Sequence, residues 1–395
     1  FSGAGGVFSN KPPPPPPRRR RPPPRPPPPP GYWWRRGLRG HAEDGLAAPG
    51  APALLLALLA AHGGDVLLPR PSPAWWTPQI RLLGRPAYHV PTTAEAGGVP
   101  DPYALLETVR RVRAEGGDPR VLLLSVADDP TATVPPPELV RESCEAAVAE
   151  GLHVVSDETW RDTLHHPRDT VLVSPAEMCP DDVTVLADLA GGGLVPASWP
   201  CAIARFPPTG RTRADRYGDP RARALDALTA LGAVLPAPVA PAAAHALDEP
   251  EDVSVPALRA AAVHGRLAAA AHRVVLAAGA LARPPKAGRH LYADLGPLRP
   301  ALAARGVTDS LELEQYLTAR LGRPVPGGHR FGDELGALRV RLDTGPLLGA
   351  DPPERAETLA SRTPEQLPQA VRALDGLAAV LDDLADPTAQ NGARR

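Results

Sequence analysis

Lysine is almost missing from this chain of 395 residues, which has 43 lysines and arginines together but only two lysines, Lys11 and Lys286. Any chemistry that needs a lysine amine as a nucleophile is therefore excluded from residues 12–285. Methionine is also scarce, because Met178 is the only one and the chain begins with Phe1. We expect the sequence to be a fragment or a processed product.

Cysteine is nearly as rare, and the three that occur are Cys144, Cys179 and Cys201. They are odd in number, far apart and never in a C-x-x-C pair, so neither a zinc site nor a disulfide framework is expected. The longest apolar stretch, 51–61, has about half the length that a membrane span needs, and residues 1–10 lack the pattern of a signal peptide. We expect no metal, no membrane partner and a cytoplasmic location.

Acidic residues are absent from residues 1–40, which carry nine positive charges, whereas the rest of the chain carries a net charge of −10. Within this part, residues 11–30 read K-P-P-P-P-P-P-R-R-R-R-P-P-P-R-P-P-P-P-P. Proline lacks an N–H and fixes φ, so we expect residues 1–30 to be a disordered arm with polyproline II character. Apart from this basic arm, no contact with nucleic acid is expected.

Short apolar runs alternate with helical patterns through the following 160 residues. Strands are expected at 66–69, 87–91, 121–126, 153–156 and 183–186, and helices at 52–62, 75–83, 103–115 and 137–150. This alternation predicts an α/β fold with a mostly parallel sheet covered on both faces. A long helix (254–281), strands 290–294 and 337–342, and helices 311–321 and 368–384 predict a smaller α+β unit.

Five segments carry motifs in a fixed order along the chain. They are G-A-P-A-L-L-L-A-L-L-A-A-H-G-G-D-V-L-L-P-R-P (50–71), D-D-P-T-A-T (128–133), S-D-E-T-W (156–160) with D-V-T-V-L-A-D-L-A-G-G-G (182–193) about 25 residues later, G-R-H-L-Y-A-D-L (288–295), and G-G-H-R-F-G-D-E-L-G-A-L-R-V-R-L (327–342). Their order and spacing resemble the class I/II aminotransferases, which are fold-type I enzymes of pyridoxal phosphate (PLP).

The resemblance implies a large PLP-transferase-like domain at 31–282, with 31–48 partly in the small domain, and a small C-terminal domain at 283–395. It also implies a cleft between the domains, a homodimer and a small amino or keto acid as substrate. The cofactor would be PLP.

The resemblance also assigns roles to single residues. Gly50 and Ala51 begin the helix that holds the cofactor phosphate. Asp157 would pair with the pyridine nitrogen, and Asp129 stands where an asparagine bonds the pyridine hydroxyl. The remaining assignments are Trp160 in place of a tyrosine, Trp75 as a stacking ring, Asp188 in place of a phosphate-binding serine, and Arg339 or Arg341 for the substrate carboxylate; spacing does not choose between the two arginines.

The departures from the family pattern cluster on the cofactor. Gly191 stands where the family has the Schiff-base lysine, and Trp199 stands where it has a phosphate-binding arginine. A carboxylate at Asp188 would repel a phosphate. We therefore expect a degenerate, catalytically impaired protein.

Two other functions stay open at this point. One is an active PLP-dependent aminotransferase, or a related amino-acid enzyme, with atypical cofactor contacts. The other is an interaction protein whose Pro/Arg-rich arm is the working part. Lys286, in P-P-K-A-G, is expected to be a solvated loop residue.

Overall fold

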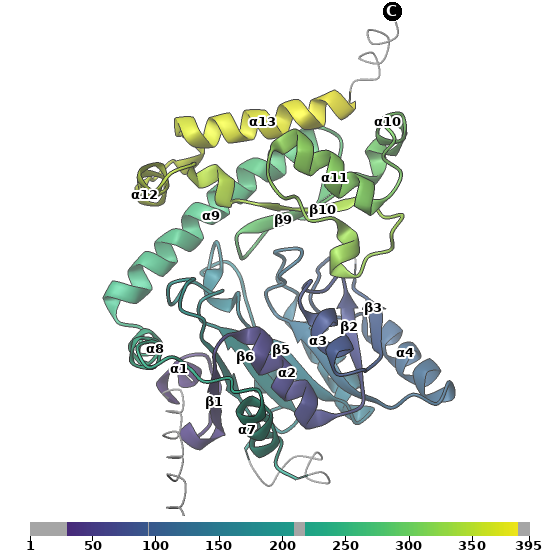
Figure 1. Cartoon of the computed structure of the whole chain (residues 1–395), viewed down its shortest axis with the longest axis vertical. Coiled ribbons are helices and arrows are strands. Elements are labelled where there is room, and N and C mark those ends of the chain that lie inside the picture. Colours follow the sequence, from purple (N-terminus) through teal and green to yellow (C-terminus); the bar gives the residue numbers. More distant parts are fainter. Residues whose placement is uncertain (1–29, 94, 209–217, 386–395) are drawn as a thin grey trace, which may run out of the picture.

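The structure is a computed structural model that describes residues 30–93, 95–208 and 218–385. The predicted arm, except for Pro30, therefore lies outside the described residues. Figure 1 shows a large sheet flanked by helices, with a smaller group of helices and strands above it. We call the first part the sheet unit and the second part the C-terminal unit.

The sheet unit contains a sheet of seven strands in the order β1-β7-β6-β5-β4-β2-β3. The strands are β1 (Gly45–Ala48), β2 (Asp65–Arg70), β3 (Ala87–Pro91), β4 (Pro119–Ser125), β5 (His153–Asp157), β6 (Val183–Asp188) and β7 (Ala202–Arg205). All neighbours pair in parallel except β7, which is antiparallel to both β6 and β1. The predicted mostly parallel α/β fold is thus confirmed.

Helices cover both faces of this sheet, as Figure 1 shows. They are α1 (Pro30–Trp34), α2 (Ala51–His62), α3 (Trp76–Leu82), α4 (Pro102–Ala114), α5 (Pro137–Ala149), α6 (Pro175–Met178), α7 (Pro220–Ala230) and α8 (Val239–Leu247). Alternate strand residues enter different cores: Leu122 and Val154 pack with α4 and α5, whereas Val121 and Val155 pack with α2 and α7. A two-residue side-chain period therefore builds two apolar layers from one set of strands.

The helix α2 has no polar face, because it lies between the sheet and α7. Leu54, Leu55, Leu58 and Leu59 are all fully buried. Gly50, with φ of 94°, precedes the helix, and Gly63 follows it. The apolar run that predicted a helix at 52–62 is therefore a buried core helix. Its N-terminus points at the carboxyl ends of the strands.

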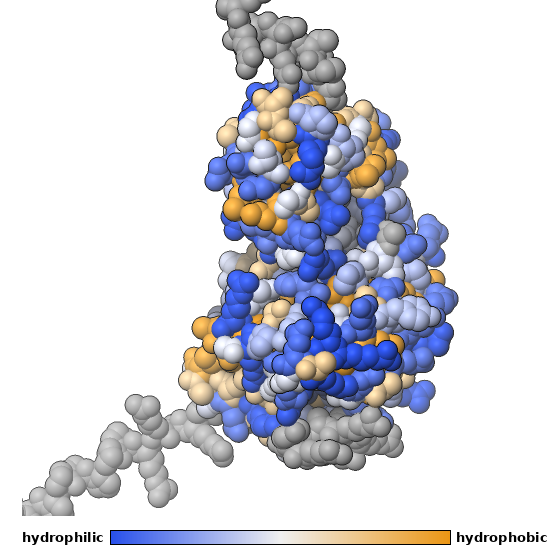
Figure 2. Space-filling view, turned by 90° about the vertical axis from the view of Figure 1, so that its right-hand side faces the viewer, coloured by the Kyte–Doolittle hydropathy of each residue, from blue (hydrophilic) through white to orange (hydrophobic). Residues whose placement is uncertain are grey.

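The C-terminal unit has a core of its own around a sheet of three antiparallel strands. Its elements are α9 (Glu251–Ala277), β8 (Leu281–Ala282), β9 (His290–Asp294), α10 (Arg299–Ala303), α11 (Ser310–Leu321), β10 (Arg339–Asp343), α12 (Pro352–Ala360) and α13 (Pro368–Ala385). Figure 2 shows the two units as two masses with a constriction between them.

Residues 31–48 lie in the sheet unit, whereas the resemblance implies that they belong partly to the small domain. Tyr32, Trp33 and Leu38 are buried in the core of the sheet unit, and β1 pairs with β7. The reason is that these apolar side chains complete the core beside α8 and the end of the sheet. The elements β1, β7, α7 and α8 were not predicted, because their short Ala-rich sequences lack a clear period.

A stacked histidine pair lies at the end of the sheet opposite the site described below. The rings of His62 and His153 are 3.9 Å apart between centroids with an interplanar angle of 16°. Burial lowers the pKa of His153 to about 3, and burial followed by the charge of His153 lowers the pKa of His62 well below its usual value. Both rings are therefore neutral in the folded protein.

We predict that this pair makes the fold sensitive to acid. The unfolded chain takes up protons near pH 6.5 and the folded chain does not, so the stabilisation present above that pH falls as the pH drops. For His153 alone the loss should reach about 2 kcal/mol at pH 5. Denaturant unfolding between pH 8 and 5 measures it.

The variant His153→Gln should flatten this pH dependence, whereas the exposed His166→Gln should leave it unchanged. Equal slopes for the His153→Gln variant and the unmodified chain would contradict the prediction.

Candidate functional site

Three predicted site carboxylates lie at the carboxyl ends of adjacent parallel strands. Asp129 follows β4, Asp157 ends β5 and Asp188 ends β6. Burial is the main cause that raises the pKa of Asp157 to about 7; the hydrogen bonds from Thr159 act to lower it, and the charges of Asp129 and Asp188 act to raise it. The three side chains are thus within electrostatic range of one another, as parallel pairing of β4, β5 and β6 requires.

The Asp188 carboxylate bonds to the N-terminus of α2. Its Oδ2 accepts a hydrogen bond from the N–H of Ala51 at 3.2 Å. Its Oδ1 accepts from the N–H groups of Ala190 and Gly191, both at 3.0 Å. A carboxylate is favoured at a helix N-terminus because the N–H groups there have no partner within the helix and carry partial positive charge. An internal anion therefore occupies this helix end.

Gly191 lies in the tight turn that Asp188 closes. A Cβ added at Gly191 would lie 3.1 Å from Cγ2 of Thr159 and 3.4 Å from Cβ of Asp188. The Thr159 hydroxyl in turn accepts a hydrogen bond from the N–H of Asp188 at 3.0 Å. The side chains of Thr159 and Asp188 thus lie close to position 191, which the resemblance aligns with the family's lysine. Trp199 is 37% exposed.

Asp129 connects the two units through Arg341. Nη1 of Arg341 lies 3.3 Å from Oδ2 of Asp129, and the two side chains are only 22% and 15% exposed. The indole Nε1 of Trp160 donates to Oδ1 of the same carboxylate at 3.1 Å. Both oxygens of Asp129 are therefore engaged, one by the C-terminal unit and one by the sheet unit.

Arg339 and Arg341 differ in their ion-pair partners, which shows which of them faces the cleft. Arg339 pairs with Asp294 at 3.0 Å and with Asp333 at 3.1 Å, both within the C-terminal unit. Arg341 reaches Asp129 across the cleft, with its guanidinium 5.2 Å from the ring of Phe331. Arg341 is thus the arginine that points at the site.

Trp75 lies beside Asp157 and leaves little space there. Its ring meets Trp76 edge to face at 6.2 Å between centroids. The void bounded by these rings, Leu55 and Asp157 has no room for a water molecule. Asp157 itself accepts from the N–H of Thr159 at 3.0 Å.

The segment 286–288 closes the cleft from the C-terminal unit. The N–H of Lys286 donates to the carbonyl of Ala132 at 2.7 Å, and its own carbonyl accepts from the N–H of His165. The N–H of Gly288 donates to the hydroxyl of Thr163 at 2.9 Å. Lys286 is exposed, as expected.

Sequence reasoning missed three residues of the site. Thr159 and Arg289 lie inside motifs that were recognised, but they were not singled out. Asp128 was also passed over: it is buried, bonds Ser125 and Thr131, and has a pKa raised to about 7 by burial. Only spatial neighbours distinguish these residues from other polar residues in loops.

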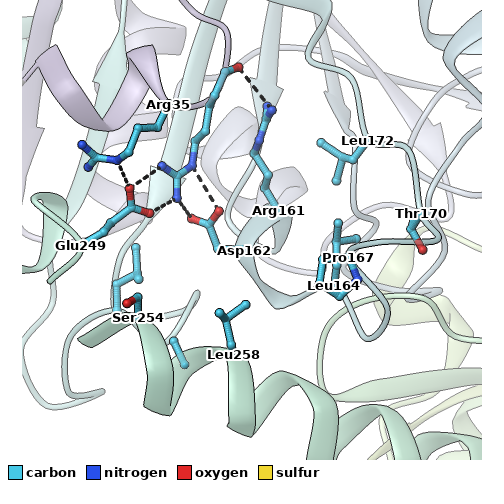
Figure 3. Close-up of a pocket in the computed structure, with 13 residues that line it drawn as sticks. Arg35, Arg161, Asp162, Leu164, Pro167, Thr170, Leu172, Glu249, Ser254 and Leu258 are labelled. Atoms are coloured by element: carbon cyan, nitrogen blue, oxygen red, sulfur yellow. Dashed lines mark hydrogen bonds and ion pairs between the residues drawn. The ribbon is translucent and has the colours of Figure 1, made fainter. Parts of the chain in front are cut away.

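A second hollow, of about 430 Å³, lies between α1, the loop after β5 and α9 (Figure 3). One wall carries Arg36, which pairs with both Asp162 at 2.7 Å and Glu249 at 2.5 Å. Figure 3 places Leu164, Pro167 and Leu172 on the other side. Because the donors of Arg36 are all engaged within the chain, this hollow offers mainly apolar contacts.

Two further findings concern the described residues only. No cluster of three or more His, Cys, Asp or Glu side chains in them is placed to hold a metal ion. None of their helices has the length and apolar character needed to cross a membrane.

Residues 47–187 match the family described as aminotransferase class I and II. A probable aspartate/prephenate aminotransferase of Thermus aquaticus is 28% identical over 137 residues, which are 35% of this chain and 33% of that protein. The chain thus aligns with about a third of this curated relative.

Solved structures share the fold over most of the chain. Thermus thermophilus aspartate aminotransferase (tetra mutant 1) has a TM-score of 0.68 and 20% identity, covering 88% of this chain and 83% of that one. N-succinyldiaminopimelate aminotransferase from Mycobacterium tuberculosis has a TM-score of 0.68 and 21% identity, covering 89% and 82%. The fold is therefore that of the fold-type I aminotransferases. Residues 47–187 are thus similar to the class I and II aminotransferases in sequence, and most of the chain shares their fold.

We predict that Asp157 takes up a proton near neutral pH. Its pKa in the folded chain is about 7, well above the value of a free carboxyl group, so the folded state loses stability as the pH rises toward 7. Asp157→Asn should therefore be more stable than the unmodified chain at pH 8, by about 1–3 kcal/mol, and less so at pH 4.5.

Denaturant unfolding across this pH range measures the difference, with the exposed Asp226→Asn as the matched control. A stability difference for Asp157→Asn that does not change with pH would show the prediction to be wrong.

Proposed function

We propose that this chain is a catalytically impaired member of its family, whose cleft does not hold PLP. The observation that carries the proposal is the hydrogen bond between the Asp188 carboxylate and Ala51. The family resemblance assigns both residues to the cofactor phosphate. Here they bond to each other, and a phosphate would have to displace a covalently tethered anion that repels it.

The other residues of the cleft fit the cofactor no better. Gly191 offers no amine, and the surrounding Thr159 and Asp188 side chains fill the space next to it. The resemblance assigns Asp157 to a protonated pyridine nitrogen, but a pKa of about 7 leaves much of this carboxyl group uncharged at neutral pH. No reaction step through PLP is therefore derived for this chain.

The residue assigned to the substrate carboxylate is also occupied by a side chain of the protein. Arg341, the arginine assigned to the α-carboxylate, is paired with Asp129. An amino or keto acid would have to displace this carboxylate, whose second oxygen Trp160 also holds. This internal pair supports the same proposal from the other side of the cleft.

An active enzyme with atypical contacts is the second candidate. Asp157 at the end of β5 and Arg341 facing the cleft favour it, since both stand where the family resemblance requires. The missing amine separates the two candidates, because only Lys11 and Lys286 can form an aldimine.

We also propose that residues 31–282 and 283–395 act as the large and small domains. Two separate apolar cores support a division into two parts, although α9 (Glu251–Ala277), within the first range, packs in the core of the second part.

We predict that the purified chain, mixed with PLP and reduced with borohydride, carries no specific pyridoxyl adduct. Peptide mass mapping and visible absorbance are the measurements, and transaminase turnover should stay at background. Lys286→Gln is the matched control. Stoichiometric labelling of Lys286 that this variant abolishes, with turnover, would overturn the proposal in favour of a relocated catalytic lysine. In the variant Gly191→Lys a weak aldimine absorbance would support the ancestry.

We propose further that the chain forms a homodimer through the side that carries the hollow of Figure 3. Val255 and Leu258 on α9 are 49% and 54% exposed there. A neighbouring hollow shares Leu194 and Ala257 with it and is lined mostly by apolar side chains. Apolar surface of this kind is a feature of subunit contacts.

Sedimentation should therefore give about twice the chain mass of 41.4 kDa. Leu258→Arg should shift the protein toward monomer, because it would bury a charge in the contact. Leu82→Arg, at a 71% exposed position of α3, should not. A monomeric unmodified chain at all concentrations would contradict the proposal.

A further inference from the structure

Arg289 is held at the start of β9, next to the cleft. Its backbone carbonyl accepts two hydrogen bonds from Thr344, one from the N–H and one from the hydroxyl, both at 2.8 Å. Thr344 is fully buried, and its hydroxyl also contacts Nδ1 of His264 at 2.7 Å. The backbone from which the Arg289 side chain extends is therefore fixed.

The side chain of Arg289 reaches the glycine turn of the sheet unit. A Cβ added at Gly193 would lie 2.4 Å from Nη2 of Arg289, and Gly193 has a φ of 82°. The positive φ favours glycine at 193, and the absence of a side chain there leaves room for the guanidinium that lies against it. The same guanidinium is 5.9 Å from the ring of Trp160. The guanidinium of Arg289 therefore lies between Gly193 and the indole of Trp160. Gly193 follows Gly191, the position of the missing lysine, by two residues.

This guanidinium differs from the other arginines around the cleft. Arg341 pairs with Asp129, and Arg339 pairs with Asp294 and Asp333. Within the part of the chain that the structure describes, the guanidinium of Arg289 makes no ion pair or hydrogen bond. Burial lowers its pKa, and no neighbouring carboxylate acts to raise it.

An arginine remains charged even when it is partly buried, so an unbalanced guanidinium is costly unless it meets an anion. Its parallel N–H groups match the two oxygens of a carboxylate or phosphate. The carboxylates of the site do not serve it: Asp188 is bonded to Ala51, and Asp129 to Arg341 and Trp160.

We propose that Arg289, between Trp160 and Gly193, is a binding site for a small oxyanion, either a carboxylate or a phosphate. This site goes beyond the proposed function, because it uses neither the cofactor contacts nor the arginine assigned to the substrate. The protein would then keep an anion-binding role in a cleft that has lost its amine.

Titration calorimetry on the full chain tests the proposal, with inorganic phosphate and malonate as separate probes at constant ionic strength. We expect saturable binding of at least one probe, and the stronger one identifies the chemical source. Arg289→Gln should weaken it about tenfold or more, because two charge-assisted hydrogen bonds are lost. Arg110→Gln, on the exposed side of α4, is the control that should bind as the unmodified chain does.

Three results would overturn the proposal. They are no saturable binding of either probe, unchanged affinity in Arg289→Gln, or a loss found in Arg341→Gln but not in Arg289→Gln. If Arg289→Gln does not fold, Arg289→Lys replaces it: it keeps the charge without the paired donors, so affinity should fall severalfold, and an unchanged affinity would again overturn the site. Borohydride labelling reports on Lys11 and Lys286 and not on Arg289, so a failure of the proposed function can be distinguished from a failure of this anion site.

Discussion

The contact between the Asp188 carboxylate and the first N–H of α2 governs how this cleft is built. It joins the end of β6 to the start of a buried helix, across 137 residues of sequence. The same carboxylate closes the turn that carries Gly191 through two more hydrogen bonds. A helix N-terminus has unsatisfied donors in any protein, and here the chain supplies the anion itself. The geometry of the turn at Gly191 and of the N-terminus of α2 therefore depends on the side chain of Asp188.

A second internal anion acts on the other side of the cleft. Asp129 forms an ion pair with Arg341 of the C-terminal unit and accepts a hydrogen bond from the indole of Trp160 in the sheet unit. It therefore links the two units. The backbone bonds of Lys286 and Gly288 to the loops of the sheet unit lie alongside. The start of α2 and the arginine that the family resemblance assigns to anions are thus each satisfied from within the chain. Arg289 is the exception, because its guanidinium has no ion pair or hydrogen bond with the described residues.

Much of the fold could be predicted because its elements have strong local patterns. Val121 to Leu124 is an unbroken apolar run, and α4 buries Leu105, Val109 and Val112 on one face. Such patterns follow from side-chain geometry within a few residues. The strands β1 and β7 were not predicted, because Gly45–Ala48 and Ala202–Arg205 owe their strand conformation to pairing with each other rather than to local preference.

The sequence by itself determined that no lysine amine lies between positions 11 and 286, and that Asp157 and Asp188 end buried strands. It also carried the ordered motifs of the family. Only the tertiary structure decided that Arg341 rather than Arg339 meets Asp129, that Asp188 lies on Ala51, and that Arg289 lies against Gly193. The physical reason is distance along the chain: these partners are separated by about a hundred residues or more, and their contact depends on the sheet order and on how the two units pack.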